Sequence, residues 1–178
     1  GLSNGELVPT SEYAYAYDKD YNNQILYSYM SSWDAANNRW YYGNKYESEY
    51  DGNGRQILSV SYNWSYDRGI WIGFSKEASV FNADGETLKR ENWINRSDTS
   101  TVWIPSYAEE VEYDDYGQLT SNWYCSGWMD GSWQSGTRYD YSYSADGLLL
   151  SESQSYMSSG QWRGTYKVDY EYNDKGQI

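Results

Sequence analysis

The sequence contains no histidine and a single cysteine, Cys125. Without histidine, the protein has no Ser-His-Asp or Cys-His nucleophile, no imidazole for acid–base catalysis and no histidine-ligated zinc. One cysteine forms neither an internal disulfide nor a thiolate metal site, and we expect Cys125 to be a partly buried small side chain. The phosphate-cradling pattern G-x-x-x-x-G-K-[ST] is missing as well. We therefore predict no cofactor and no metal site, and we expect the protein not to be an enzyme.

Long apolar runs and positive charge are also scarce. No apolar run approaches the roughly 20 residues that span a membrane, so we predict no membrane span. The 178 residues include 26 acidic and 13 basic ones, a net charge of -13, and this acidity argues against nucleic acid as a partner. Phenylalanine is rare (2), whereas tyrosine (23) and tryptophan (10) are abundant. These two residues combine apolar area with a polar tip, which suits half-buried surfaces and contacts with sugars or proteins.

An internal repeat of about 31 residues runs through the chain. A tryptophan and a glycine stand fourteen residues apart five times, and an aromatic residue always stands four residues before the glycine. The tryptophan–glycine pairs are Trp40 and Gly54, Trp71 and Gly85, Trp103 and Gly117, Trp133 and Gly147, and Trp162 and Gly176. We expect these five tryptophans to belong to the core, because function seldom needs the same residue in every repeat.

Residues between each tryptophan and its glycine alternate with period two, which is typical of a strand with one aromatic and one charged face. The expected aromatic sets are Trp40, Tyr42, Tyr46 and Tyr50, then Tyr139, Tyr141 and Tyr143, then Trp162, Tyr166, Val168, Tyr170 and Tyr172; the charged set that opposes the first is Lys45, Glu47 and Glu49. The second repeat departs from the pattern, so its strand is either covered on both faces or bulged at Gly73. Pro105, in the third repeat, predicts a bulge or a sheet edge.

Hairpin turns are predicted at Asn53-Gly54, Asp84-Gly85 and Asp146-Gly147, and Asn23 replaces the glycine in a degenerate first half repeat. The predicted fold is all-β, with about eleven antiparallel strands in sequence order. The tandem hairpins would form a long curled meander sheet, either a partial barrel, a shell or a folded-over two-layer sheet. We divide the chain into an N-terminal segment, 1–12, and a single β-repeat domain, 13–178.

Four turn sequences resemble the Y-D-x-x-G-R-L core of tyrosine-aspartate (Rhs-type) repeats: YDGNGRQILS at Tyr50, YDDYGQLTS at Tyr113, YSADGLLLS at Tyr143 and YNDKGQI at Tyr172. The longer spacing with two tryptophans resembles variants in uncharacterised secreted proteins of gut Bacteroidetes. The resemblance implies antiparallel sheets that form shells, no catalytic residues, and a secreted, periplasmic or bacterial cell-surface location. Trp40-Tyr41-Tyr42-Gly43 resembles choline- and glucan-binding repeats more loosely.

Paired carboxylates are the catalytic chemistry that remains. A glycosidase needs two at roughly 5 to 10 Å, and Glu109, Glu110 and Glu112 beside Asp114 and Asp115 could supply them. The alternative interpretation of these acids is a solvated charged face. Calcium could bind at Asp114-Asp115 or at Asp18-Lys19-Asp20, although neither has the ligand density of known calcium loops.

Aromatic residues outside the repeat pattern are the candidate ligand contacts. Tyr41 falls among the alternate residues of its strand that are polar, and Tyr124 and Trp128 bracket a glycine-rich turn. Trp128 has no expected counterpart in the other repeats. We predict a non-enzymatic, exported or cell-surface binding module for a glycan or a surface protein. The alternative is a structural spacer or shell segment of a larger surface protein, and a carboxylate-dependent glycosidase is the third hypothesis. The sequence leaves the oligomeric state open.

Overall fold

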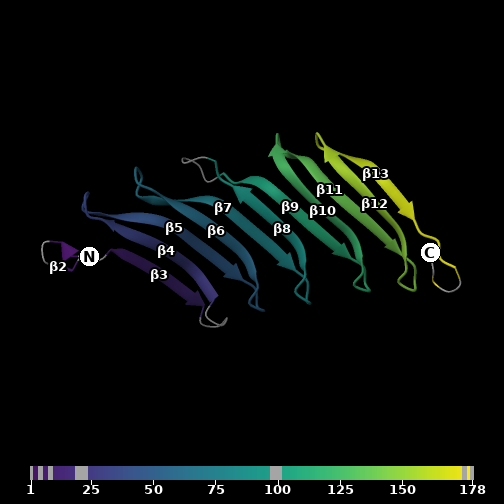
Figure 1. The fold of residues 1–178 in the computed structure, drawn as a ribbon, viewed down its shortest axis with the longest axis horizontal. Helices are drawn as coiled ribbons and strands as arrows, with labels where there is room; N and C mark the ends of the chain where they lie inside the picture. Colours follow the sequence, from purple (N-terminus) through teal and green to yellow (C-terminus); the bar gives the residue numbers. More distant parts are fainter. Residues whose placement is uncertain are drawn as a thin grey trace. The chain divides into compact units, whose positions relative to one another are not determined.

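The computed structural model is all-β, as predicted, and describes residues 2–3, 6–7, 10–18, 24–96, 102–173 and 176. Eleven strands, β3 to β13, follow one another in sequence order in an open antiparallel sheet, and β1 and β2 form a separate pair (Figure 1). Strands β3 and β13 end this order, and no pairing within the described ranges joins them into a barrel. The part of the chain that the structure describes contains no helix long and apolar enough to cross a membrane.

The strand bounds are β1 (Leu2–Ser3), β2 (Glu6–Leu7), β3 (Ser11–Asp18), β4 (Gln24–Asp34), β5 (Arg39–Tyr50), β6 (Gln56–Ser65), β7 (Ile70–Phe81), β8 (Thr87–Ile94), β9 (Ile104–Tyr113), β10 (Leu119–Met129), β11 (Ser132–Tyr143), β12 (Leu149–Ser158) and β13 (Gln161–Asp169). The chain divides into two compact units, unit 1 (Gly1–Ala78 and Trp93–Ile104) and unit 2 (Ser79–Asn92 and Pro105–Ile178). Each unit is described by itself.

In β5, β7 and β11 the repeated tryptophan is the second residue of the strand and the repeated aromatic residue is its last. Trp40 is the second residue of β5, and Tyr50 is its last. Trp133 and Tyr143 hold the same places in β11. The constant tryptophan-to-glycine spacing therefore corresponds to one long strand and the turn that follows it, as the repeat predicted.

The repeat glycines close the turns in a left-handed conformation. Gly54 and Gly85 have φ values of 80° and 93°. The Gly54 N–H donates to the Asp51 carbonyl at 2.9 Å, and the Asp51 N–H donates to the Arg55 carbonyl at 2.9 Å. This pattern matches a three-residue hairpin loop whose last residue is left-handed. The hairpin turns predicted at these dipeptides are confirmed, and at Asp84-Gly85 the glycine alone has a positive φ.

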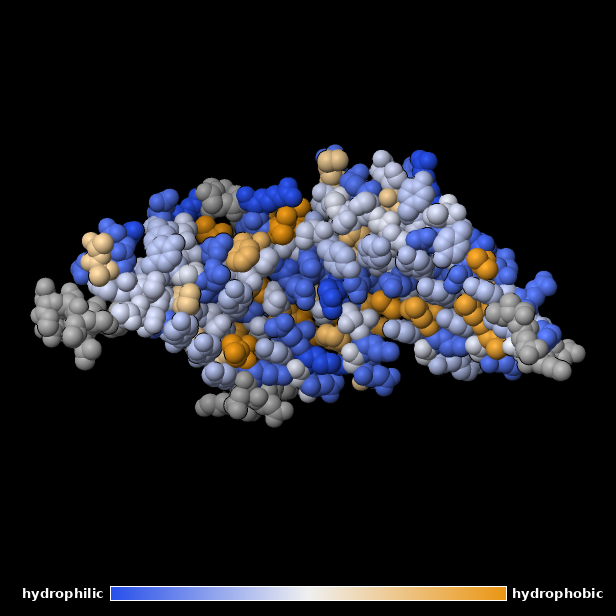
Figure 2. Space-filling model, in the orientation of Figure 1, coloured by the Kyte–Doolittle hydropathy of each residue, from blue (hydrophilic) through white to orange (hydrophobic). Residues whose placement is uncertain are grey.

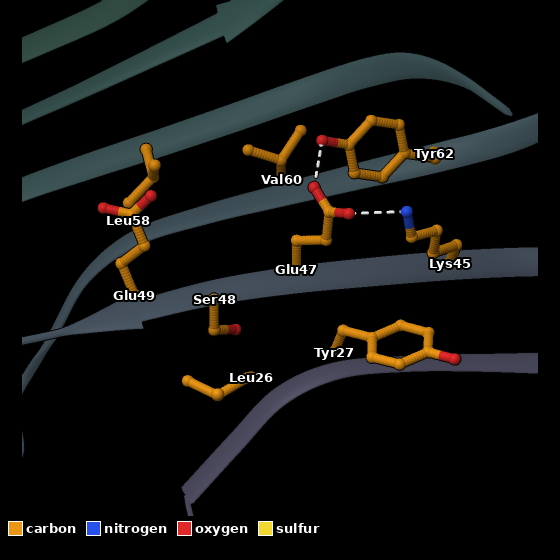
Figure 3. Close-up of a pocket in the computed structure, with 9 residues that line it drawn as sticks. All are labelled: Leu26, Tyr27, Lys45, Glu47, Ser48, Glu49, Leu58, Val60 and Tyr62. Carbon is orange, nitrogen blue, oxygen red and sulfur yellow. Dashed lines mark hydrogen bonds and ion pairs between the residues drawn. The ribbon is translucent and has the colours of Figure 1, made fainter. Parts of the chain in front are cut away.

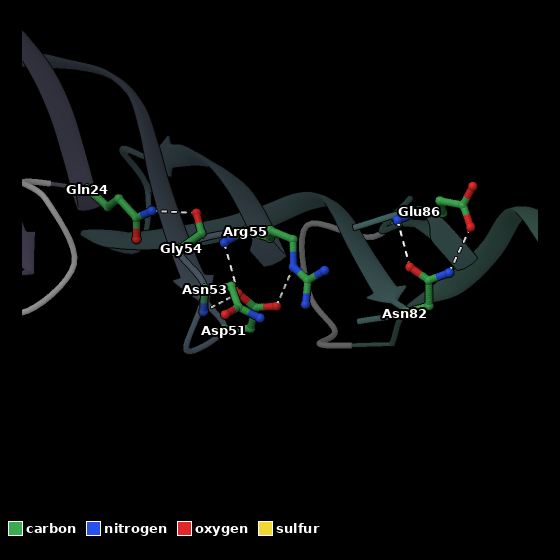
Figure 4. Close-up of polar contacts among 7 residues, drawn as sticks. All are labelled: Gln24, Asp51, Asn53, Gly54, Arg55, Asn82 and Glu86. Carbon is green, nitrogen blue, oxygen red and sulfur yellow. Dashed lines mark hydrogen bonds and ion pairs between the residues drawn. The ribbon is translucent and has the colours of Figure 1, made fainter. Parts of the chain in front are cut away.

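A side chain at the start of each turn fixes the loop. The Asp51 carboxylate accepts the amides of Asn53 and Arg55 at 2.9 Å, and the Asn82 side chain accepts the Glu86 amide at 2.9 Å (Figure 4). The hydrogen bond from the Arg55 amide, above all, holds the pKa of Asp51 below its usual range. A short side-chain acceptor satisfies loop amides that no strand neighbour reaches, which explains why aspartate follows tyrosine in the repeat.

Side chains also connect hairpins to their neighbours at the turn end, in both units. In unit 1, the Gln24 amide donates to the Gly54 carbonyl (Figure 4), and the Tyr50 hydroxyl donates to the Ile25 carbonyl at 3.1 Å. Unit 2 repeats both bonds, from Gln118 to the Gly147 carbonyl at 3.2 Å and from Tyr172 to the Leu149 carbonyl at 2.9 Å. The repeated tyrosine thus serves to hold successive hairpins at one spacing.

A bulge in β5 overturns the predicted division into an aromatic and a charged face. Tyr29 is opposite Lys45 but Ser31 is opposite Tyr42, so β5 carries one extra residue at this point. An extra residue reverses the alternation. Tyr42, and with it Trp40, therefore lies on the same face as Lys45, Glu47 and Glu49, and Tyr46 lies on the other.

Strands β7 and β13 carry a bulge at the same place, shortly after the repeat tryptophan, and further register shifts lie beside the glycine turns. In β13, Gln154 is opposite Tyr166 but Ser155 is opposite Gly164, so Trp162 and Tyr166 lie on opposite faces and were wrongly grouped. In β7, the shift between Ser75 and Gly73 confirms the bulge alternative for that strand. In β11 the Arg138–Asp140 stretch pairs without a shift, so Tyr139 and Tyr141 do oppose Arg138 and Asp140.

The buried core is small. Among the described residues, the hydrophobic side chains that are buried are Val60, Ala108 and Cys125, and Cys125 is 1% exposed. The prediction that the repeated tryptophans form a core is only partly right, because four of them are half-buried and Trp162 is 39% exposed. Hydrophobic side chains occur in small groups among hydrophilic ones (Figure 2). The sheet therefore leaves aromatic rings accessible on its faces.

Because the turn glycines are left-handed, we predict that a methyl group added at one of them lowers the stability of the protein. Gly117 has φ 79°, and a Cβ there would meet no atom within 4 Å, so Gly117→Ala adds backbone strain alone. We expect urea denaturation to give a free energy of unfolding lower by about 1–2 kcal/mol. Gly164→Ala is the matched control, because its Cβ also meets no atom and no positive φ is required. Equal effects of the two substitutions would contradict this role for the turn.

Candidate functional site

Tryptophan pairs lie at the strand ends remote from the glycine turns. Trp33 packs edge-to-face on Trp40 with ring centroids 5.5 Å apart. Trp64 and Trp71 repeat this contact at 5.2 Å, and Trp128 and Trp133 do so at 5.1 Å. Trp128 therefore has counterparts in Trp33 and Trp64, contrary to expectation. Edge-to-face pairs of this kind contribute about 0.5–1.5 kcal/mol beyond their buried area, which indicates a structural role.

In unit 1, the face that carries Trp40 also carries a groove, which we call the carboxylate groove. It has a volume of about 570 Å³, and Figure 3 shows its lining by Leu26, Tyr27, Lys45, Glu47, Ser48, Glu49, Leu58, Val60 and Tyr62. The register explains the assembly, because Tyr27 is opposite Glu47 and Glu47 is opposite Val60. Three strands, β4, β5 and β6, thus contribute an apolar floor, two tyrosine rings and two carboxylates.

Glu47 lies at the centre of a polar cluster in this groove. Its carboxylate lies 2.5 Å from the Lys45 ammonium and accepts a hydrogen bond from the Tyr62 hydroxyl (Figure 3). The ammonium also lies over the ring of Tyr62 at 4.9 Å and that of Tyr27 at 5.8 Å. Partial burial alone would raise the pKa of Glu47, but the bonds from Lys45 and Tyr62 outweigh it and lower the pKa. Burial and then Glu47 raise the pKa of Tyr62.

Glu49 differs from Glu47 in having no partner among the residues that the structure describes. It lies at one end of the groove beside Leu58, its cross-strand neighbour (Figure 3). Its side chain is exposed, and within the described residues it makes no hydrogen bond or ion pair. The groove therefore presents one compensated and one uncompensated carboxylate on the same face.

The opposite face of unit 1 carries the tyrosine face, which consists of Tyr13, Tyr15, Met30, Tyr41 and Tyr46. Tyr15 is opposite Ser28, and Ser28 is opposite Tyr46, so two rings flank a small residue. A shallow groove of about 240 Å³ lies here, with Asn44 also in its lining. The side chains are largely accessible, at 58% for Tyr13, 50% for Tyr15 and 47% for Tyr46. Sequence reasoning assigned Tyr46 to the face of Trp40 and so missed this group.

Of the predicted contact residues, Tyr41 is in unit 1 and belongs to the tyrosine face. It is 52% exposed and is opposite Ser32. Its ring stacks on Tyr66 at 5.1 Å, and the Arg39 guanidinium lies over the Tyr66 ring at 5.4 Å. The ring is thus accessible but braced by a neighbour.

Tyr124 and Trp128 belong to unit 2 and have different surroundings. Tyr124 is 41% exposed and is opposite Glu109 on one side and Thr137 on the other. Trp128 packs on Trp133, as described above. A small cavity of about 150 Å³ in unit 2 is lined by Trp123, Cys125, Trp133, Arg138, Met157 and Trp162.

The acidic candidates divide between the two faces of the sheet, with Glu110 and Glu112 on the same one. Glu109 is opposite Tyr124 and Glu110 is opposite Trp123, so these adjacent carboxylates point to opposite faces of the sheet. Asp114 accepts the amides of Tyr116 and Gln118 at 2.9 Å within its turn. Lys19, Asp20 and the side chain of Asp18 lie outside the described residues, as does Asn23. Within the described part of the chain, no three acidic or cysteine side chains form a group that could hold a metal ion.

The Lys45–Glu47 pair carries a signal that sequence reasoning overlooked. Arg138 and Asp140, and Lys167 and Asp169, stand at the same distance before their repeat glycines. Each is an ion pair, and both distances are 2.7 Å. A cation and an anion two residues apart on a strand share one face, so this spacing indicates an ion pair.

No protein-family model and no curated protein matches the chain. The chain is similar in structure to a protein of unknown function from Bacteroides fragilis NCTC 9343, with a TM-score of 0.35 and 11% identity over 91% of this chain and 93% of that one. It is also similar to a DUF3836 family protein from Parabacteroides distasonis ATCC 8503, with a TM-score of 0.35 and 17% identity over 53% of this chain and 91% of that one. Both similarities are too distant to bear on function, and the resemblance to Rhs-type repeats stays a prediction.

The lowered pKa of Glu47 predicts an acid-labile contribution to stability. A carboxylate whose pKa is depressed by folding stabilises the protein above its unfolded pKa, near 4.5, and loses this effect as the pH falls through the folded pKa. We expect Glu47→Gln to flatten the decline in the free energy of unfolding below about pH 4.5. Asp67→Asn, at an exposed turn position of unit 1, is the control. If the free energy of unfolding of Glu47→Gln declines below pH 4.5 as steeply as that of the wild type, the stabilising role of this cluster is contradicted.

Proposed function

We propose that the protein is a non-enzymatic, exported or cell-surface module that binds neutral glycans on the tyrosine face. The observation that carries this proposal is the pair of exposed rings, Tyr15 and Tyr46, on either side of Ser28. Two strand spacings separate the strands of these rings, about 9.5 Å, so a flat ring fits between them. Tyrosine rings stack on the C–H face of a sugar, and their hydroxyls bond its rim.

The surrounding side chains support a sugar more than an apolar ligand. The Asn44 amide lies 3.4 Å from the Tyr46 hydroxyl, so polar groups border the groove. Ser28 adds a hydroxyl at its floor. Exposed aromatic groups with a polar rim are typical of binding surfaces. Beneath this face β4 and β5 are paired on both sides, so within the described sheet only the outer edge of β3 offers backbone groups to an extended peptide.

The exported location is part of the proposal, and the resemblance of the turn sequences to repeats of secreted bacterial proteins supports it. Cell fractionation of the native bacterium, with the protein detected by antibody, tests this part separately.

The binding test uses a microarray of neutral polysaccharides, followed by titration with the best ligand. We expect Tyr15→Ala and Tyr46→Ala each to lower the affinity at least about tenfold, because each removes one stacking ring worth about 1.4 kcal/mol. Tyr116→Ala is the matched control, since Tyr116 is 86% exposed on a turn of unit 2 and belongs to neither groove.

Two results would contradict the proposal. If no neutral glycan binds the wild-type protein, the structural-spacer alternative or a protein ligand becomes the better hypothesis. If a glycan binds but all three variants bind equally well, the site lies elsewhere. Release of sugar from any bound polysaccharide would favour the glycosidase hypothesis instead.

A further inference from the structure

We propose that the carboxylate groove binds a glycan that carries a free amino group, with the ammonium on Glu49 and the sugar ring beside Tyr27. This inference rests on the proposed glycan-binding function and adds a charge-selective site on the opposite face of unit 1. The carboxylate groove has a volume of about 570 Å³, which is within the range of pockets that hold small ligands, roughly 300–1,000 Å³.

Charge is the first argument. Two cations lie near the groove, and both have partners. Lys45 is paired with Glu47 at 2.5 Å, and Lys76, which is opposite Val60, lies over the Trp93 ring at 4.1 Å. The Glu49 carboxylate has no partner within the described residues and is the uncompensated charge of the groove. The net charge of -13 adds a long-range attraction for cations.

The way the groove holds Lys45 shows that these side chains suit an ammonium. The Lys45 Nζ lies between the rings of Tyr27 and Tyr62 and against a carboxylate, a combination of cation–π and charge-assisted contacts. Glu49 lies diagonally across from Tyr27, a position that on a sheet is about 7–8 Å away. A sugar ring beside Tyr27 can therefore place an attached ammonium at Glu49.

The apolar floor favours a sugar over a purely polar cation. Leu26, Leu58 and Val60 lie among the polar groups (Figure 3). A pyranose has a C–H face for such a floor and a rim of hydroxyls and amines for the carboxylates. A basic peptide would also supply charge, but its backbone amides would find no partner here, because β4, β5 and β6 each pair with a strand on both sides.

The test compares two probes by calorimetric titration at pH 5.5: the fully deacetylated hexamer of β-1,4-linked glucosamine, whose amino groups are free and charged, and its fully N-acetylated form, whose amino groups are acetylated and neutral. We expect the charged hexamer to bind at least tenfold more tightly. Glu49→Gln should lower this affinity about tenfold and leave binding of the acetylated hexamer unchanged. Asp67→Asn, which removes one exposed acid from a turn of unit 1, should change neither.

The outcomes separate this inference from the proposed function. Equal losses in Glu49→Gln and Asp67→Asn would mean diffuse attraction to an acidic protein and would overturn the groove assignment. Equal affinity for the two hexamers would overturn it as well, while neutral-glycan binding that is sensitive to Tyr46→Ala would leave the proposed function standing. Hexalysine serves as a third probe: if it binds as tightly and with the same dependence on Glu49, the groove is a basic-peptide site and the sugar assignment is wrong.

Discussion

The register between neighbouring hairpins is the constraint on which the faces of this sheet depend. Each glycine turn fixes where two strands start to pair, and the Gln24 and Tyr50 bonds to the neighbouring hairpin fix the next pairing. Because side chains alternate, an error of one residue would move every side chain to the other face. The repeat therefore uses its most regular residues for register, and its variable residues are left to define the surfaces.

The bulge in β5 modifies this register and creates both candidate surfaces of unit 1. It brings Lys45, Glu47 and Glu49 to the face of Tyr27, and it brings Tyr46 to the face of Tyr15. Without the extra residue, Trp40 would lie on the same face as Tyr46. The acidic side chains would then lie on the face opposite to the tryptophan pairs. The small core is consistent with these roles, since few side chains besides Val60, Ala108 and Cys125 are withdrawn from solvent in the described residues.

Much of the fold was predictable from the sequence, because the spacing of Trp40 and Gly54 reports directly on one strand and one turn. The β7 bulge was also anticipated, since Gly73 interrupts an apolar pattern. The β5 bulge was not, because Trp40, Tyr42 and Tyr46 alternate perfectly in the sequence. The grooves could not be predicted for a related reason: Tyr27, Glu49 and Tyr62 come from three strands, and only the register brings them together. Trp128 was thought unique because it stands five residues before its repeat tryptophan, whereas Trp33 and Trp64 stand seven residues before theirs.

The most direct measurement is the pattern of cross-strand nuclear Overhauser effects between the backbone protons of β4 and β5. With the bulge, contacts join Tyr29 to Lys45 and Ser31 to Tyr42. An uninterrupted ladder that continues from the Ser31–Tyr42 pair would instead join Tyr29 to Asn44. Observation of the first pattern would support the two faces described here. Observation of the second would contradict both grooves, because their residues would then lie on different faces.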